Sequence, residues 1–367
     1  RPLHVADAIG RVGTDVSAVD RTDILSIVER AAEVEIVAFQ PADDAQRSGT
    51  QRGRAIAFYT MGIPLGSGLA MILGGQLVAM LLDAPRYSWP LFGELYAWQK
   101  VFLLVGLPGL VMALLMLSVR EPRRRERLIS ATNAADPATP LPVRVVFNFL
   151  RARWRLYGSH FLGMSVVGIL TYGFLAWIPT MFIRTWGWTI REIGFAYGCV
   201  TLVSGALAVL LVAKLARALE RRGYADVYMR VALCCCVLGF TGAVATPIMP
   251  HPALAIVMLI PMTVGTIAAT GAGLTGLMVV TPNQMRAQAS ACYYLVVNIL
   301  GLTLGPTGIA LFTDYVFASD GMLRYSVLCV SLLAGAFASG FLIYHLGQYR
   351  RAVAESRSWS EDPVISA

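Results

Sequence analysis

Residues 231–285 read VALCCCVLGFTGAVATPIMPHPALAIVMLIPMTVGTIAATGAGLTGLMVVTPNQM and contain no Asp, Glu, Lys or Arg. A helix needs about 20 residues to cross the hydrocarbon core of a bilayer, so this run is long enough for two crossings. The segment Pro247-Ile-Met-Pro-His-Pro252 places three prolines near the middle of the run. Because proline disrupts the interior of a helix, we expect two membrane helices joined by a short turn.

The rest of the chain repeats this pattern. Hydrophobic residues make up 56% of the sequence and charged residues 14%, which lies outside the usual range for soluble domains. Six further runs without charged residues are long enough to span a bilayer: 55–82, 101–119, 156–183, 193–213, 287–313 and 325–349. Backbone groups in lipid must be hydrogen-bonded within their own segment. We therefore predict an all-α polytopic membrane protein with eight transmembrane helices.

The basic residues predict the orientation of these helices. From Arg52 onward, the loops and the C-terminal end on one side of the membrane hold 20 Lys and Arg residues, including Arg123–Arg127, and the opposite side holds five. Basic residues favour the cytoplasmic side, so we expect both termini and the 120–155 loop to lie in the cytoplasm. We expect the chain to reside in the plasma (inner) membrane. Nucleic-acid binding is the weaker interpretation of the arginine cluster, because the cluster directly follows a predicted span.

The sequence gives no sign of a metal or cofactor site. All six cysteines fall inside predicted spans, and no Cys-x-x-Cys pair or nearby His cluster exists. We therefore interpret the cysteines as small packing residues. An intramembrane enzyme would need paired carboxylates, a Ser/His pair or a metal-ligand cluster at one depth. No span offers one, so we predict no catalytic residues and no cofactor.

Three segments lie outside the spans. Residues 1–51 carry 14 charged side chains and only a weak helical pattern at 24–37. The 120–155 segment is long, arginine-rich and contains prolines, which is typical of a linker between two helical bundles. Residues 350–367 form the predicted cytoplasmic tail.

Glycines suggest an internal repeat. The first two spans resemble the last two. The first span opens at Arg54 and has Gly74-Gly75 20 residues later, and the seventh opens at Arg286 and has Gly305-Pro306 19 residues later. Parallel repeats are typical of transporters, although glycines in membrane helices also serve close packing alone. The predicted packing residues are Gly62, Gly66, Gly68, Gly74, Gly75, Gly301, Gly305 and Pro306.

Residues 52–349 resemble the major facilitator superfamily. Arg52-Gly-Arg54, Gly62-Ile-Pro-Leu-Gly66-Ser-Gly68 and Gly74-Gly75 resemble the fifth helix of that superfamily. Trp98, Gly106-Leu-Pro-Gly109 and Arg120-Glu-Pro122 resemble its sixth helix. The spinster-like branch is the most similar, on the motifs Tyr172-Gly173-x-x-x-Trp177-x-Pro179, Thr281-Pro-Asn-x-Met-Arg286, Asn298, Gly305-Pro-Thr307 and Thr313-Asp314. The resemblance implies an incomplete fold: two helices of the N-terminal bundle (52–119) and a complete six-helix C-terminal bundle (156–349).

The chain departs from this family in two places. Residues 1–51 bear no likeness to the family's first four helices, which usually carry the groups that couple transport to protons. We hypothesise that these residues are a translation in the wrong reading frame, or a false start, joined to a real gene, which sequencing of the upstream gene would decide. The segment Lys214–Arg230 keeps Arg221-Arg222-Gly223 and Asp226 but lacks the usual Gly and Asp at its start.

Candidate substrate contacts are the polar and aromatic residues near the middle of the spans: Gln76, Tyr172, Trp177, Thr270, Tyr294 and Asn298. Each also has a structural interpretation. Tyr172 and Trp177 suit a core or an aromatic belt, and Asn298 and Gln76 suit hydrogen bonds between helices. His160 and His345 lie near span ends, where we expect both to face lipid headgroups.

These features predict a secondary transporter that works by alternating access, with the lipid bilayer and a small molecule as partners and no nucleic acid. An amphiphilic or lipid-like cargo suits spans with few charges and many aromatic residues, and the spinster resemblance implies the same class. The proton is the candidate coupling ion. The alternative is a transport-incompetent remnant or a membrane scaffold, and we expect that this polypeptide alone does not transport.

Overall fold

The computed structural model describes residues 45–82, 88–89, 93–118 and 142–358. The chain divides into two units, residues 1–59 and 60–367, and the first unit is described only from residue 45, as the beginning of helix α3. The weak helix predicted at 24–37 therefore lies outside the described residues. The hypothesis of a shifted reading frame concerns residues 1–51, of which only 45–51 are described. Residues 119–141 of the predicted linker and 359–367 of the tail also lie outside them.

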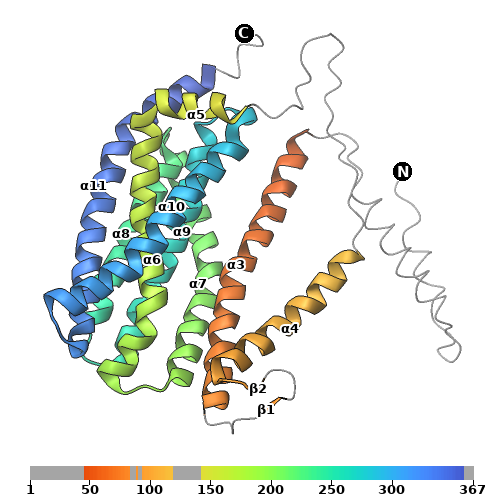
Figure 1. The fold of residues 1–367 in the computed structure, drawn as a ribbon. Coiled ribbons are helices and arrows are strands. Elements are labelled where there is room, and N and C mark those ends of the chain that lie inside the picture. Colours follow the sequence, from red (N-terminus) through yellow and green to blue (C-terminus); the bar gives the residue numbers. More distant parts are fainter. Residues whose placement is uncertain (1–44, 83–87, 90–92, 119–141, 359–367) are drawn as a thin grey trace, which may run out of the picture. The chain divides into compact units, whose positions relative to one another are not determined.

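Eight of the described helices are long and apolar enough to cross a membrane, which confirms the predicted all-α polytopic fold. Figure 1 shows them in chain order. Their bounds are α3 (Ala45–Leu82), α4 (Ala97–Leu117), α6 (Trp154–Trp186), α7 (Ile190–Arg221), α8 (Val227–Ile248), α9 (Pro252–Val279), α10 (Arg286–Leu311) and α11 (Leu323–Ser358).

The predicted turn in the apolar run is confirmed. Helix α8 ends at Ile248 and α9 begins at Pro252, so Met249–His251 make the connection. Pro252 suits the first turn of a helix because the N–H that proline lacks has no partner within the helix there. At its C-terminal end, helix α10 continues as a π-helical turn, Phe312–Val316. Short 3₁₀ turns precede α10 at Asn283–Met285 and α11 at Asp320–Met322.

Several helices extend beyond the charge-free runs. Helix α7 continues to Arg221 and α11 to Ser358, because the backbone hydrogen bonds of a helix do not require apolar side chains. The sequence did not predict helix α5 (Val143–Ala152), which lies inside the presumed linker and buries Val146 and Leu150. Two antiparallel strands of two residues each, β1 (Ser88–Trp89) and β2 (Gly93–Glu94), also precede α4.

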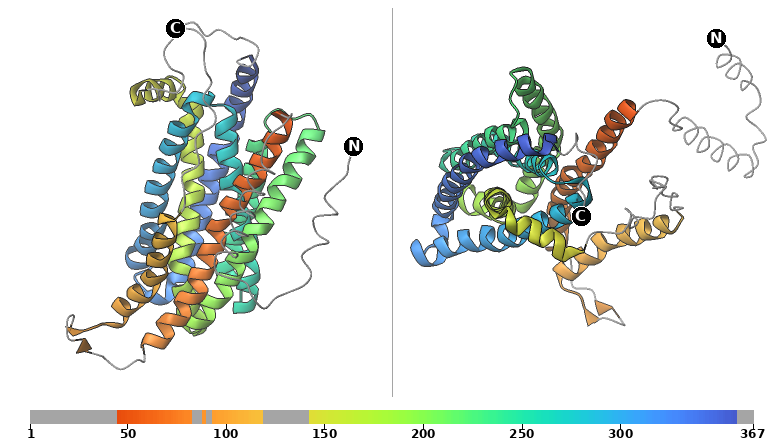
Figure 2. Two further views of the ribbon diagram at one scale, coloured as in Figure 1. Left: turned by 90° about the vertical axis from the view of Figure 1, so that its right-hand side faces the viewer. Right: turned by 90° about the horizontal axis from the view of Figure 1, so that it is seen from above.

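Helices α6 to α11 form one bundle. Helix α6 packs against α10 and α11, α8 packs against α9 and α11, and α7 packs against α9. The views in Figure 2 show these six helices running together, with α5 across one end. Two apolar clusters fill the bundle, one around Tyr157, Met229 and Leu342 and the other around Phe174 and Leu259.

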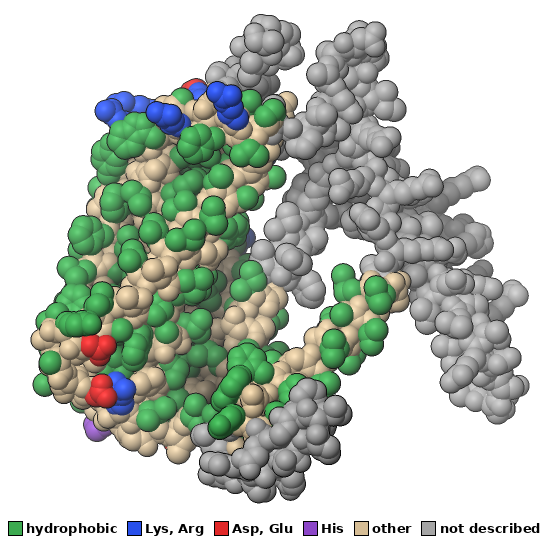
Figure 3. All heavy atoms as spheres, in the orientation of Figure 1, with side chains coloured by type: hydrophobic (Ala, Val, Ile, Leu, Met, Phe, Trp, Pro, Cys, Tyr) green, Lys and Arg blue, Asp and Glu red, His purple; other side chains and the backbone are tan. Residues whose placement is uncertain are grey.

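The surface of this bundle matches a membrane environment. Figure 3 shows hydrophobic side chains over the sides of the helices and Lys and Arg side chains gathered at one end. We call this the arginine-rich end, and it comprises the exposed side chains of Arg144, Arg151, Arg155, Arg350 and Arg351.

Glycines bring two pairs of helices into close contact. A Cβ atom added at Gly198 of α7 would lie 2.7 Å from the carbonyl oxygen of Gly68 on α3, and one added at Gly305 of α10 would lie 2.6 Å from that of Ile169 on α6. A side chain at either glycine would therefore force the two helices apart. Gly75 and Gly301 also lie at these contacts, whereas at Gly62, Gly66 and Gly74 the described residues place no atom within 4 Å of an added Cβ.

Candidate functional site

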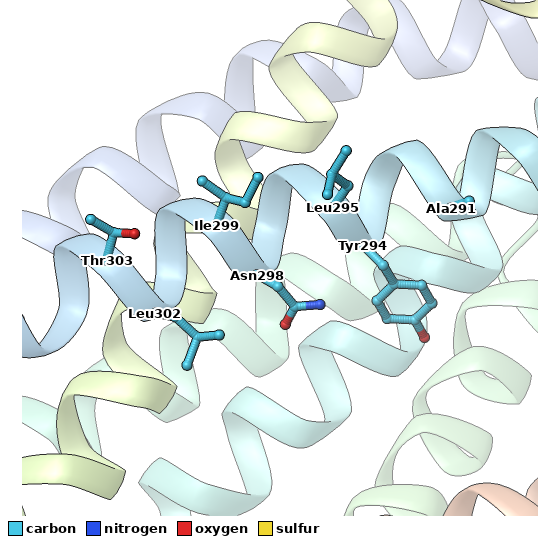
Figure 4. A pocket seen from close by; sticks show the side chains of 7 residues that line it. All are labelled: Ala291, Tyr294, Leu295, Asn298, Ile299, Leu302 and Thr303. Atoms are coloured by element: carbon cyan, nitrogen blue, oxygen red, sulfur yellow. The ribbon is translucent and has the colours of Figure 1, made fainter.

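One face of α10 lines a shallow hollow of about 480 Å³ that is largely open on its other sides among the described residues. The lining side chains recur every three or four residues along the helix, which is the spacing that keeps them on one face. Figure 4 shows them along α10. They are Ala291, Tyr294, Leu295, Asn298, Ile299, Leu302 and Thr303.

The chemistry of this face is largely apolar. None of its seven lining residues carries a charge, and only Tyr294, Asn298 and Thr303 can form side-chain hydrogen bonds. In Figure 4 the side chains of Tyr294, Asn298 and Leu302 project to the same side of α10. The Tyr294 side chain is exposed, so its hydroxyl and the Asn298 amide are available to one polar group of a ligand.

A hydrogen bond to α6 positions Asn298. The Tyr172 hydroxyl on α6 donates to Asn298 Oδ1, with 2.5 Å between the oxygens. This bond uses the amide oxygen as an acceptor and leaves the Asn298 NH₂ group as the donor that a ligand can reach. Tyr172, Tyr294 and Asn298 therefore come together in the structure, although they are up to 126 residues apart in the sequence.

The other three predicted contacts do not line this hollow. Trp177 Nε1 donates to the carbonyl oxygen of Pro306 on α10 at 2.9 Å. The Thr270 hydroxyl donates to the carbonyl oxygen of Thr266 within its own helix, also at 2.9 Å, which leaves less hydrogen-bonding capacity for a ligand. Gln76 is half-buried on α3.

The prediction for His160 and His345 was wrong. Their side chains do not face headgroups, because they are only 2% and 1% exposed. Their ring centroids are 5.0 Å apart between α6 and α11. His345 lies three residues after Leu342 and four before Tyr349, which places it on the same face of α11 as two residues of the core.

An ion-pair cluster holds α8 and α11 together at the arginine-rich end. Asp226 is 1% exposed, and its two carboxylate oxygens lie 2.7 Å from the Nε atoms of Arg230 and Arg350. Burial on its own would raise the pKa of Asp226, but hydrogen bonds from the two guanidinium groups outweigh it and lower the pKa. Nearby, Arg153 pairs with Glu355 at 2.5 Å.

This arrangement of membrane helices agrees with a comparison of the sequence with known families. The model of the family described as Major Facilitator Superfamily matches residues 46–306. The chain belongs to the Major Facilitator Superfamily. It is therefore a multi-pass membrane protein of a transporter family, and the match begins six residues before Arg52, within α3.

Two curated relatives have transport-related names. A protein of Mycolicibacterium smegmatis named MFS-type efflux pump is 26% identical over 314 residues, which are 83% of this chain and 66% of that protein. A quinolone resistance transporter of Acinetobacter baumannii is 25% identical over 288 residues, which are 72% of this chain and 59% of that protein. The chain thus spans less than two thirds of the length of either relative.

Solved structures support the resemblance to the spinster-like branch at the level of the fold. A crystal structure of a bacterial homologue of the human lysosomal transporter Spinster, inward-facing and unoccupied, superimposes with a TM-score of 0.57 at 21% sequence identity. The alignment covers 87% of this chain and 73% of that one. The occupied form of the same kind of protein gives a TM-score of 0.56.

Proposed function

We propose that the chain takes part in secondary transport of a small amphiphilic molecule, with the α10 face in contact with the substrate. The bundle α6–α11 would form one wall of a central path, and the second wall would rock against it in alternating access. The observation that carries this proposal is the uncharged hollow on α10, where the polar pair Tyr294 and Asn298 lies among apolar residues. The helix that carries it belongs to a chain of the Major Facilitator Superfamily.

The composition of this face favours one substrate class. An organic anion would need a cationic side chain at the site, because an unpaired charge is costly within the membrane. None of the residues that line the hollow supplies one. A molecule with a large apolar surface and one or two uncharged hydrogen-bonding groups fits better, and neutral lipid-like compounds such as a monoacylglycerol belong to this class.

The close helix contacts suit a moving transporter. Where Gly198 meets Gly68 and Gly305 meets Gly173, backbone lies against backbone. The glycines add no side chain of their own to these contacts, so the helices can slide with fewer groups to repack. We infer that α3 and α7 move as neighbours during the cycle.

A protection assay tests the site. In a cysteine-free background, Thr303→Cys on the α10 face and Leu333→Cys, an exposed position on α11, would be labelled with a maleimide. We expect a monoacylglycerol, which carries no charge, to slow labelling at position 303 and not at position 333. Equal slowing at both positions, or none at either, would contradict the assignment of the α10 face.

Vesicles separate transport from the alternative of a remnant or scaffold. We expect that this polypeptide alone binds the probe but shows no saturable, gradient-driven uptake, because the α10 face is open in the described structure. Saturable uptake by this polypeptide would overturn that expectation and remove the remnant and scaffold alternative. Transport moves its substrate without breaking or forming covalent bonds, so we expect the probe to be recovered chemically unchanged.

A further inference from the structure

Three polar atoms on neighbouring helices are buried without a hydrogen-bond partner among the described residues. They are His160 Nε2 on α6, Tyr293 Oη on α10 and His345 Nε2 on α11. Buried polar atoms are nearly always paired in native proteins, so a group of such atoms in one place calls for an explanation. We call the three residues the histidine cluster, and it lies at the same end of the bundle as α5.

The geometry of the histidine cluster is compact. The His160 ring centroid lies 5.0 Å from that of His345 and 5.6 Å from that of Tyr293. Each imidazole also has an anchor: His345 Nδ1 lies 2.9 Å from Ser159 Oγ, and His160 interacts with the backbone of Gly273 on α9. Four helices therefore meet at two imidazoles that each keep one free nitrogen.

The groups that face the two imidazoles carry no compensating charge. Helix α10 contributes Tyr293, α11 contributes Tyr349 at 5.6 Å from His345, and α9 contributes the Gly273 backbone. The other neighbours lie on α6 and are also uncharged: Ser159, Phe161 and the Leu156 backbone. The carboxylate of Asp226 acts electrostatically on Tyr349, but it is already paired with two arginines. An imidazolium here would lack a counter-ion, and such a charge is costly in a buried site.

We propose that His160 and His345 form a proton-binding pair that holds α6 against α11 while both rings are neutral and releases the contact when one ring is protonated. A protonated ring is stabilised by water, so protonation favours a conformation in which the pair is hydrated. By linkage, the conformation that binds protons more tightly gains population as the pH falls. A lower pH therefore opens this end of the bundle between α6 and α11.

The histidine cluster also contacts the candidate substrate face. The Tyr293 ring packs on His160 and lies 5.3 Å from the ring of Tyr294, and Tyr294 lines the α10 hollow. Separation of α6 from α11 would shift Tyr293 and, through it, Tyr294. This link rests on the proposed function, because it assigns the hollow to a substrate, whereas the proton-binding pair does not depend on it.

Distance measurements between spin labels test the pair. Labels at Leu162→Cys on α6 and Ile343→Cys on α11, both exposed positions beside the cluster, would be placed in a cysteine-free background of the full chain in lipid nanodiscs. We expect a longer-distance population to grow between pH 7.5 and pH 5.5 and to reverse when the pH is restored. The double variant H160Q/H345Q should lose this response, and H251Q, at an exposed histidine in the α8–α9 turn, should keep it.

The proposal is overturned if the distances are the same at both pH values, or if the double variant responds like the parent chain. Should the double variant not fold, hydrogen exchange on the unsubstituted chain gives an independent answer. After correction for the intrinsic pH dependence of exchange, residues 156–165 and 341–350 should lose protection at pH 5.5 while residues 239–247 do not. Equal protection would also reject the pair, and neither experiment requires a substrate.

Discussion

Asn298 shows how one residue gives an apolar face its polarity. Its amide oxygen accepts from Tyr172, which fixes the side chain and leaves the NH₂ group toward the hollow. A freely rotating amide would offer a ligand either a donor or an acceptor. The bond to Tyr172 selects the donor, so the α10 face should prefer substrates with a hydrogen-bond acceptor.

Asp226 shows how a buried charge is used at the end of the bundle. Because the arginines lower its folded pKa, the ionised carboxylate stabilises the folded state above the pKa of the unfolded chain, about 3.9. This stabilisation is lost as the pH falls through the lower, folded pKa. We expect Asp226→Asn to reduce the free energy of unfolding by about 2 kcal/mol at pH 7.

Thermal unfolding in detergent at several pH values would check this prediction. The melting temperatures of Asp226→Asn and the parent chain should differ by a constant amount between pH 7 and pH 5 and converge in more acidic solution. Glu220→Gln, at an exposed carboxylate of α7, should unfold like the parent at every pH. A difference for Asp226→Asn that persists unchanged into acid would contradict the ion-pair account.

At the scale of elements, the contact between α3 and α7 depends on the absence of side chains. A Cβ at Gly198 would lie 2.5 Å from Ile72 Cγ1 as well as 2.7 Å from the Gly68 carbonyl oxygen. We expect Gly198→Leu to separate the two helices at a cost of about 1–3 kcal/mol, as for other overpacked contacts. Gly340→Leu is the matched control, because an added Cβ at Gly340 would meet no described atom within 4 Å.

Crosslinking gives the readout for this prediction. In a cysteine-free background, Met71→Cys and Thr201→Cys, whose native side chains lie 4.0 Å apart between sulfur and oxygen, should react with a short bifunctional thiol reagent. The crosslink yield should fall in the presence of Gly198→Leu and stay unchanged with Gly340→Leu. Equal yields in all three chains would show that α3 does not rest on α7.

The elements could be predicted from the sequence to different degrees. The eight long helices were predictable because an apolar run of about 20 residues has few other uses. Helix α5 could not be predicted in this way, because it is short and contains Arg144 and Arg151. Its buried face consists of only Val146 and Leu150. Of the six candidate contacts, Tyr294 and Asn298 line the hollow.

What the sequence could not supply was the pairing of distant segments. Tyr172 meets Asn298 only because α6 packs on α10. His160 and His345 were misjudged for the same reason, since each lies near a span end and appears exposed until α6 and α11 are placed together. Periodicity assigns a residue to a face of its helix, but it does not say which helix covers that face.

At the scale of the whole molecule, the arginine-rich end should lie in the cytoplasm. Single cysteines at Arg144 of α5 and at His251 of the α8–α9 turn, both exposed, test this in whole cells. A membrane-impermeant maleimide should label position 251 in intact cells and position 144 only after permeabilisation. The reverse pattern would mean that the chain is inserted in the opposite sense.

Equilibrium binding of a monoacylglycerol to the full chain in nanodiscs tests most directly whether the α10 face is a substrate site. We expect saturable binding that Tyr294→Phe weakens about 2- to 10-fold, because one hydrogen bond is lost. Tyr344→Phe, at an exposed tyrosine of α11, should leave the affinity unchanged. Binding that is not saturable, or equal affinity in the parent chain and both variants, would contradict the assignment of the α10 face as the substrate site.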